Sequence, residues 1–391
     1  MPWYMLASDI SPYSVSPANR DDRDDPAWIY GTFRSIGLAL LVGLTALCSA
    51  RGAHAHVVPL PHVSVGRIVR LRRLPSQYVE PRNVDVWLPP GYPRQAPYAV
   101  LYMFDGQMLF DAHLTWNHES WHAARTAARL IASGKTRPFI IVGIWNTPLR
   151  TSEYYPQKPW ESLTGAQHRR LFAERFGHRP VLQVAPFSDA FLRFMTRQLK
   201  PAIDRRFAVD PRRDATFVMG SSMGGLLAWY AMAEYPQVFG GAACLSAHWP
   251  GVSLSMKPQP HNPSTAAFIR FIGKHFPSPA HHRIYFDHGT RTLDALYGPA
   301  QRRVDRLLRS KGWTGRHFES RVFPGVDHSE KSWAARLAIP MTFLPAPPPR
   351  AAGHRRRGHG GMSRTVRRAH RPPAAERRGG LQRLSPGDFA D

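Results

Sequence analysis

Residues 220–224 read Gly-Ser-Ser-Met-Gly, which places a glycine two positions before and another two positions after a central serine. This G-x-S-x-G spacing is typical of a strand that turns sharply into a helix and holds the serine hydroxyl clear of the sheet. Glycine suits both outer positions because the neighbouring backbone passes too close for a side chain. We therefore predict that Ser222 is a nucleophile and that Gly220 and Gly224 form the elbow around it.

The segments on either side of this elbow have the composition that the motif requires. Residues 215–219 are an apolar run rich in strand formers, and residues 226–235 have a helical composition that ends before Pro236. A helix that starts here aims its first N–H groups at the serine, so we expect the N–H of Met223 to bind an oxyanion. The alternative is a glycine-rich turn that only packs a helix on a sheet. Ser221 is expected to cap or pack rather than react.

A nucleophilic serine needs a base, and the chain has nineteen histidines, so only the context of a histidine is informative. His328 lies in the polar loop 324–330, between the short apolar strand 321–323 and the helical sequence 333–337. A loop after a late strand is where a hydrolase of this kind holds its base. We predict that His328 is the base, the alternative being a helix-capping or exposed histidine.

The base in turn needs an acid that orients it. Asp287 and Asp294 both follow the predicted strand 283–286, at the end where open α/β sheets place their sites. The order Ser222, Asp294, His328 is the order found in hydrolases with this serine motif, so we predict Asp294 as the acid. Asp287 remains the alternative, because either aspartate can instead brace a turn or cap a helix.

The rest of the central region alternates between strand and helix patterns. Two alternating segments and two continuous apolar runs predict strands over 65–71, 82–88, 98–104 and 139–144. Helices are predicted over 121–132 and, capped by Ser188-Asp189, over 188–199. This order predicts an α/β fold with a mostly parallel, doubly wound sheet and antiparallel leading strands. The irregular segment 148–186 is either a lid or a surface excursion.

The N-terminal region, residues 1–55, is predicted to be an extension that ends in a signal peptide. Its apolar segment 36–47 is too short to span a bilayer but suits a secretory leader, with cleavage expected after Ala50 or Ala55. The chain is therefore expected to be secreted or periplasmic, without a stable membrane span. An uncleaved anchor or a buried helix is the alternative. After cleavage Cys244 is the only cysteine, so no intramolecular disulfide is expected.

The formal net charge of +25 is partly concentrated in the C-terminal region. Residues 345–391 are rich in proline, glycine and arginine and lack core-forming residues, so we predict a disordered basic tail after a folded domain over 56–344. The remaining basic residues lack the interleaved aromatic residues of a nucleic-acid groove, so no specific nucleic acid is expected. A weak interaction of the tail with anionic surfaces is the alternative to plain disorder.

Several motifs together resemble the Putative esterase (esterase D-like) family of α/β hydrolases. They are the elbow at 220–225, Tyr-Met-Phe-Asp-Gly-Gln at 102–107, the segment 142–147 with Arg150 and Glu153-Tyr154, and Pro-Gly-Val-Asp-His at 324–328. The resemblance covers roughly residues 63–344 and includes feruloyl, siderophore-ester and mycolyl-transferring enzymes. It implies an α/β-hydrolase fold, a Ser-Asp/Glu-His triad and a second oxyanion donor at Gly106 or Gln107. Family members often carry the acid closer to the glycine than the Gly289-to-Asp294 spacing of this chain.

These observations predict a serine carboxylic-ester hydrolase that acts on a small-molecule ester through an acyl-enzyme. No cofactor or metal is expected, because Asp105, Asp111 and His113 show no recurring ligand spacing. One alternative is an acyltransferase similar to the mycolyl-transferring enzymes. Another is a catalytically retired binding protein, although such a protein has no need of a serine, a histidine and a carboxylate together.

Overall fold

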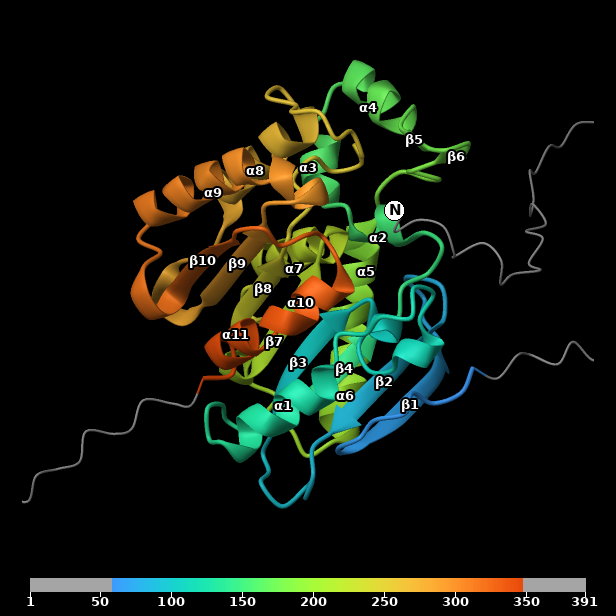
Figure 1. The fold of residues 1–391 in the computed structure, drawn as a ribbon, viewed down its shortest axis with the longest axis vertical. Coiled ribbons are helices and arrows are strands. Elements are labelled where there is room, and N and C mark those ends of the chain that lie inside the picture. The colour runs from blue at the N-terminus through green and yellow to red at the C-terminus, as the bar shows by residue number, and fades with distance from the viewer. Residues whose placement is uncertain (1–57, 347–391) are drawn as a thin grey trace, which may run out of the picture. The chain divides into compact units, whose positions relative to one another are not determined.

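One mixed sheet runs through the computed structural model, which describes residues 58–346 (Figure 1). Its eight strands within these residues are β1 Arg67–Leu74, β2 Arg82–Leu88, β3 Ala99–Phe104, β4 Phe139–Ile144, β7 Thr216–Ser221, β8 Gly241–Leu245, β9 Arg283–Gly289 and β10 Phe318–Phe323. Their order is β1-β2-β4-β3-β7-β8-β9-β10. Strand β2 is antiparallel to both β1 and β4, and the pairings from β4 to β10 are parallel. The predicted α/β sheet with antiparallel leading strands is confirmed.

Alternation along the central strands divides the core into two layers. In β3, Val100, Tyr102 and Phe104 pack on one face, whereas Leu101 and Met103 pack on the other. Residues of α5 Ser188–Phe194, α6 Lys200–Arg206, α7 Met223–Glu234, α8 Pro263–His275 and α9 Gly298–Ser310 join the first layer. Residues of α1 Ala123–Ala132, α10 Glu330–Arg336 and α11 Ala338–Phe343 join the second, in front of the sheet in Figure 1. Helices on both faces explain why the central parallel strands β3, β4, β7 and β8 are buried along their whole length.

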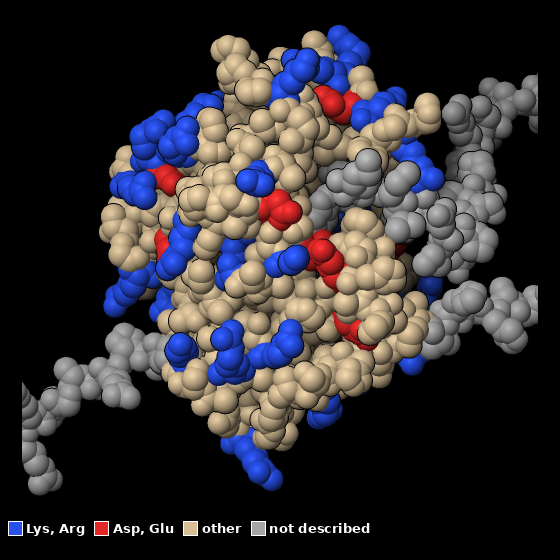
Figure 2. Space-filling view, viewed as in Figure 1, with Lys and Arg blue, Asp and Glu red and all other residues tan. Residues whose placement is uncertain are grey.

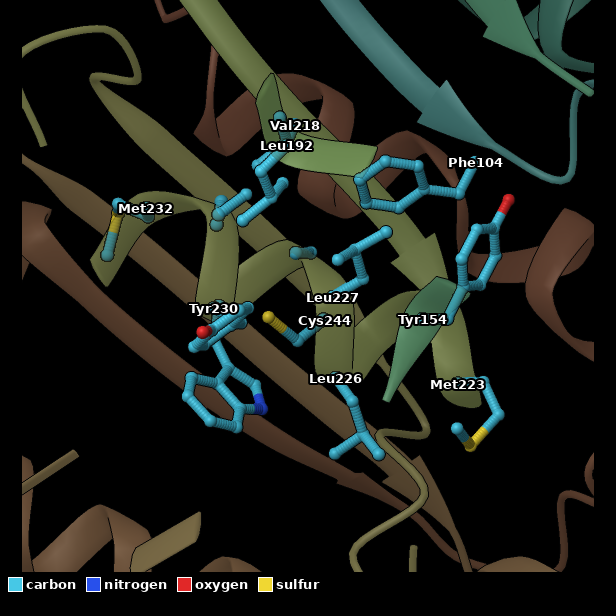
Figure 3. Packing of buried hydrophobic residues seen from close by; sticks show 14 of the residues in the cluster. Phe104, Tyr154, Leu192, Val218, Met223, Leu226, Leu227, Tyr230, Met232 and Cys244 are labelled. Atoms are coloured by element: carbon cyan, nitrogen blue, oxygen red, sulfur yellow. The ribbon is translucent and has the colours of Figure 1, made fainter. Parts of the chain in front are cut away.

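Helix α7 is the most deeply buried helix of the first layer. All its residues from Met223 to Ala233 are buried, as expected for a helix that is apolar on every side. Figure 3 shows Leu227 of α7 near Phe104 of β3 and Cys244 of β8. Because tight packing surrounds α7 on all sides, its N-terminus is held in a fixed position above the sheet.

The structure differs from the prediction in the helix that starts near Ser188. Ser188 is the first helical residue of α5 rather than its cap, and its Oγ accepts a hydrogen bond from the N–H of Gln157 at 2.9 Å. The helix also continues beyond Leu199, through a π-helical segment Met195–Leu199 and into α6. The helix continues because α6 buries the apolar side chain of Ile203 against the core.

The segment 148–186 is more regular than its sequence indicated. It contains α2 Arg150–Tyr154, α3 Gln157–Glu161, α4 Gly165–Phe172 and a short hairpin of β5 Arg175–Phe176 and β6 Arg179–Pro180. Four residues of α2, Thr151 to Tyr154, are buried, so this part of the segment belongs to the core. In α4 only Leu171 is buried, and the two strands of the hairpin have no buried residue.

The two edges of the sheet are β1 and β10. The pairing of β1 with β2 shifts register between Leu71 and Leu74, where Arg73 has a φ of 40°.

On the face in Figure 2, Lys and Arg side chains lie over several separate elements rather than in one stripe. Within residues 58–346 no helix is long and apolar enough to cross a membrane. The predicted leader and the tail beyond residue 346 lie outside the described residues.

Candidate active site

Ser222 occupies the junction between β7 and α7. Strand β7 ends at Ser221 and α7 begins at Met223, so the serine alone makes the turn, with φ 55° and ψ −121°. A positive φ is costly for a residue with a side chain, by about 1–3 kcal/mol. The N–H of Ser222 donates to the carbonyl of Leu245 at 2.9 Å, which ties the turn to the end of β8.

The two glycines of the elbow are packed differently, and a Cβ on Gly224 would make only ordinary contacts, at 3.4 Å or more. A Cβ on Gly220 would lie 2.6 Å from the carbonyl carbon of Gly224, closer than such atoms approach. Strand and helix therefore touch where they diverge, and the turn at Ser222 has no room to relax. This close packing holds Ser222 at its positive φ, a backbone conformation that serine seldom adopts.

His328 and Asp294 lie against each other at the carboxyl ends of the last two strands. Nδ1 of His328 is 2.6 Å from Oδ1 of Asp294, and both side chains are buried. Asp294 lies in the 3₁₀ helix Thr292–Leu296 after β9, and His328 lies between β10 and α10. The N–H of His328 donates to Oγ1 of Thr292 at 2.9 Å, which joins the two loops directly.

Asp287, the alternative acid, has different partners. It forms an ion pair with Arg336 at 3.0 Å and accepts a hydrogen bond from the hydroxyl of Tyr285 at 2.9 Å. Burial raises the pKa of Asp287 above its ordinary value, although Arg336 opposes the shift. The structure thus places Asp294, and not Asp287, against His328.

The surroundings of Asp294 favour its ionised form. Burial acts to raise the pKa of this carboxyl, but the hydrogen bond and charge of His328 and the hydrogen bonds from Ser246 and the N–H of Gly289 bring it below the ordinary value. A buried carboxylate with several donors is stable as an anion. It can therefore hold the imidazole of His328 by its Nδ1–H and leave Nε2 for proton transfer.

His248 and Tyr297 also lie beside this cluster, and the sequence interpretation did not include them. Nε2 of His248 lies 3.1 Å from the carbonyl oxygen of Ser253, so Nε2 carries a hydrogen. Nδ1 therefore accepts a hydrogen bond from the hydroxyl of Tyr297 at 2.5 Å. Burial is the main cause that lowers the pKa of His248 to about 3, which keeps this ring neutral.

Both residues touch the predicted triad. The N–H of His248 donates to the carbonyl of Ser222 at 3.1 Å. The ring of Tyr297 meets that of His328 edge to face with centroids 5.7 Å apart, and Trp333 does the same at 5.0 Å. His248 follows β8 and Tyr297 follows β9, at the strand ends where open α/β sheets place their sites. Nothing in the local sequence, however, distinguishes these two residues from packing residues.

The predicted oxyanion loop follows β3. Gly106 and Gln107 are the first two residues of the 3₁₀ helix Gly106–Met108, so no carbonyl of that helix can accept their N–H groups. The same holds for Met223 at the start of α7. A Cβ on Gly106 would lie 2.5 Å from the carbonyl carbon of Gly143, which explains why only glycine fits there.

Side chains hold this loop in place beside the elbow. Asp105, with φ 56°, forms an ion pair with Arg150 at 2.7 Å and accepts from Nδ2 of Asn146 at 2.6 Å. Nε2 of Gln107 donates to Oδ1 of Asn146 at 2.6 Å. A Cβ on Gly224 would be 3.5 Å from Oδ2 of Asp105, so the loop and the elbow are adjacent.

The residues weighed as metal ligands have other partners. Asp105 is paired with Arg150, and Asp111 accepts hydrogen bonds from the N–H groups of His62 and His113. In the described part of the chain no group of three or more His, Cys, Asp or Glu residues could hold a metal ion.

Comparisons with known proteins give relatives that are similar in sequence or in fold. Ferri-bacillibactin esterase BesA of Bacillus subtilis (strain 168) is 27% identical over 181 residues, which are 45% of this chain and 58% of the relative. A ferulic acid esterase structure is similar with a TM-score of 0.50 and 16% identity, covering 73% of this chain and 99% of that one. An IroE-like serine hydrolase from Shewanella oneidensis has a TM-score of 0.50 and 19% identity, covering 71% of this chain and 79% of that one. At these identities the structural similarity concerns the fold.

The family is established by a match along most of the folded region. A family model described as Putative esterase matches residues 76–342, which include the elbow, both aspartates and His328. This match covers more than half of the chain, and the sheet order and the elbow agree with it. The chain therefore belongs to the Putative esterase family of α/β hydrolases.

Proposed function

We propose that this chain is a serine carboxylic-ester hydrolase in which Ser222, His328 and Asp294 form the catalytic triad. The observation that carries the proposal is the 2.6 Å contact between Nδ1 of His328 and Oδ1 of Asp294. A buried histidine held in this way presents its other nitrogen as a base. The strained serine at the elbow supports the same conclusion.

We expect the reaction to proceed in two steps. Nε2 of His328 takes the proton of Ser222 as its Oγ attacks the ester carbonyl, and Asp294 stabilises the imidazolium that forms. The N–H groups of Met223 and of Gly106 or Gln107 bind the oxyanion of the tetrahedral intermediate. The imidazolium then gives its proton to the leaving alcohol, and water releases the acid from the acyl-enzyme by the same route.

The substrate is proposed to be a small-molecule ester. The similar proteins are described as esterases of ferri-bacillibactin and of ferulic acid, so ferri-bacillibactin and esters of ferulic acid are the first substrates to test. Product analysis with and without an added alcohol separates hydrolysis from acyl transfer, since only a transferase gives mainly the new ester.

A fluorophosphonate probe tests the activated serine directly. We expect labelling of the wild-type chain and loss of labelling in Ser222→Ala and His328→Ala. The matched control is Ser152→Ala, because Ser152 is also buried and its Oγ donates to the carbonyl of Val184, at 2.8 Å. Labelling that persists in Ser222→Ala would contradict the assignment. A folded wild-type protein that reacts with neither the probe nor any ester would favour the binding-protein alternative.

Export is a separate proposal that rests on the sequence of the leader. Expression with the native N-terminus in a bacterial host is expected to give a mature protein that begins after Ala50 or Ala55. Intact-mass analysis of the exported fraction checks this, and a mass that retains the earlier residues would contradict it.

A further inference from the structure

We propose that Ser246 is a positioning residue for Asp294, and that Trp333 and Arg336 fix the direction of its hydroxyl. The inference rests on the proposed function, because it assigns Asp294 as the acid of the triad. Ser246 is the first residue after β8 and is fully buried.

The direction of the Ser246 proton follows from its three partners. Oγ of Ser246 lies 3.0 Å from Nε1 of Trp333, 2.9 Å from Nη2 of Arg336 and 2.7 Å from Oδ2 of Asp294. Indole and guanidinium N–H groups can only donate hydrogen bonds. Both lone pairs of the hydroxyl are therefore occupied as acceptors. In the described part of the chain, the proton of Ser246 is left with one acceptor, the carboxylate of Asp294.

This arrangement fixes the rotation of the carboxylate. Oδ2 of Asp294 accepts hydrogen bonds from Ser246 and from the N–H of Gly289 at 2.6 Å, so Oδ1 is the oxygen left to face His328. Charge-assisted hydrogen bonds of this kind are short and directional. Ser246 thereby sets the orientation of the group that orients the base.

The fold holds Ser246 in a conformation that it would not adopt alone. Its φ is 46°, and its N–H donates to the carbonyl of Asp287 at 2.8 Å, which anchors the end of β8 to β9. Asp287 also fixes Arg336 through contacts of 3.0 and 3.1 Å to its two oxygens. Asp287 therefore acts on Asp294 indirectly. It holds Arg336, which donates to Ser246, and Ser246 donates to Asp294.

Ionisable groups surround Asp294 on several elements, and any pH-dependent readout reflects all of them. They are His328, Asp327, His248, Asp287 and Arg336. Removing the hydroxyl of Ser246 takes one hydrogen-bond donor away from the Asp294 carboxylate. The negative charge of Asp294 then stabilises the imidazolium of His328 more strongly. The acid limb of the pH–rate profile should therefore move to higher pH.

The test measures the second-order rate constant of fluorophosphonate labelling against pH for the full chain and for Ser246→Ala. Without this hydroxyl the carboxylate no longer holds His328 in one orientation, which predicts a fall in this rate constant of about tenfold or more at neutral pH. The acid limb should also shift upward. Ser152→Ala, which loses one buried serine hydroxyl elsewhere, should change neither quantity.

An unshifted acid limb with a rate within twofold of wild type would overturn the proposal. If Ser246→Ala does not fold, Trp333→Phe takes its place, because it keeps an aromatic ring beside His328 and removes one donor to Ser246. We then expect the same changes on a smaller scale, and a wild-type profile in Trp333→Phe would be contradictory. Wild-type protein that does not label at all refutes the proposed function instead, so the two failures are distinguishable.

Discussion

Nδ1 of His248 and the hydroxyl of Tyr297 are joined by a buried hydrogen bond of 2.5 Å beside the ring of His328. The ring of His248 is neutral, and its other nitrogen is already committed to a carbonyl. Among residues 58–346 the hydroxyl of Tyr297 is the donor that satisfies Nδ1, and the tyrosine ring is held edge-on to the proposed base.

Tyr297→Phe is expected to destabilise the fold by about 1–3 kcal/mol, because it leaves a buried acceptor on His248 unsatisfied. The matched control is Tyr102→Phe, since the hydroxyl of the equally buried Tyr102 has no hydrogen-bond partner among the described residues. Urea unfolding of the three proteins checks the difference. Equal stabilities for the two variants would show that the His248 contact contributes nothing.

Asn146→Ala should slow the reaction without unfolding the protein. Asn146 links Asp105 to Gln107, so its removal loosens the loop that carries the proposed oxyanion donors. Loss of one such donor costs about 10²–10³ in kcat, and a loosened donor should cost about tenfold with little change in KM.

The control for this prediction is Asn262→Ala. Asn262 caps α8 and accepts from the N–H of Thr265 at 2.9 Å, so it should cost about 1 kcal/mol of stability and leave kcat unchanged. If both variants lower kcat equally, the loop contacts of Asn146 have no specific role.

Arg82 and Glu153 form a buried, two-pronged ion pair, with contacts of 2.9 and 2.6 Å. It joins β2 to α2, the helix that also carries Arg150. Arg82→Met or Glu153→Met alone should cost about 3–5 kcal/mol, because each strands a buried charge. The double variant should cost clearly less than the sum. Urea unfolding of all four proteins tests this, and strictly additive losses would contradict it.

Glu330 should make stability fall as pH rises. Burial is the largest cause that raises its pKa to about 8 from an ordinary 4.5, although Asn117 donates to its Oε2 at 2.8 Å. The folded state therefore holds this proton more tightly than the unfolded state does. The resulting stability is complete below about pH 4.5 and is lost progressively up to about pH 8.

Glu330→Gln removes this titration while keeping an oxygen for Asn117. Its stability at pH 9 should exceed that of wild type by an amount on the order of a few kcal/mol, and the difference should shrink toward pH 5. Urea unfolding at pH 5, 7 and 9 provides the measurement. Parallel curves for the two proteins would be the contrary result.

The sequence predicted those parts of the molecule whose signals are local. A strand, a glycine-bounded serine and a helix follow one another within twenty residues, so the elbow at Ser222 could be placed from spacing alone. Strand β8, which reads Gly-Ala-Ala-Cys-Leu, was not predicted, because small residues without alternation carry little strand signal. Helices α8 and α9 were also absent from the predicted elements.

Side-chain partners far apart in the chain could not be predicted in this way. Asp287 and Asp294 both follow the same predicted strand, and only the packing of Arg336 against one and His328 against the other separates them. Ser246 and Arg336 are ninety positions apart and meet only because β8, β9 and α10 are adjacent in the fold. No spacing rule within one segment contains that information.

The outer strands of the sheet bear on how the protein behaves at high concentration. Strand β1 carries the exposed Arg67, Arg72 and Arg73 along with its register shift, and β10 carries the exposed Arg321. Charged, irregular edge strands disfavour pairing with the edge strand of a second copy. Replacing these arginines by valine would remove that charge and favour aggregation through the sheet edges. Concentrated solutions of the variant should therefore turn turbid under conditions in which the wild-type protein stays clear.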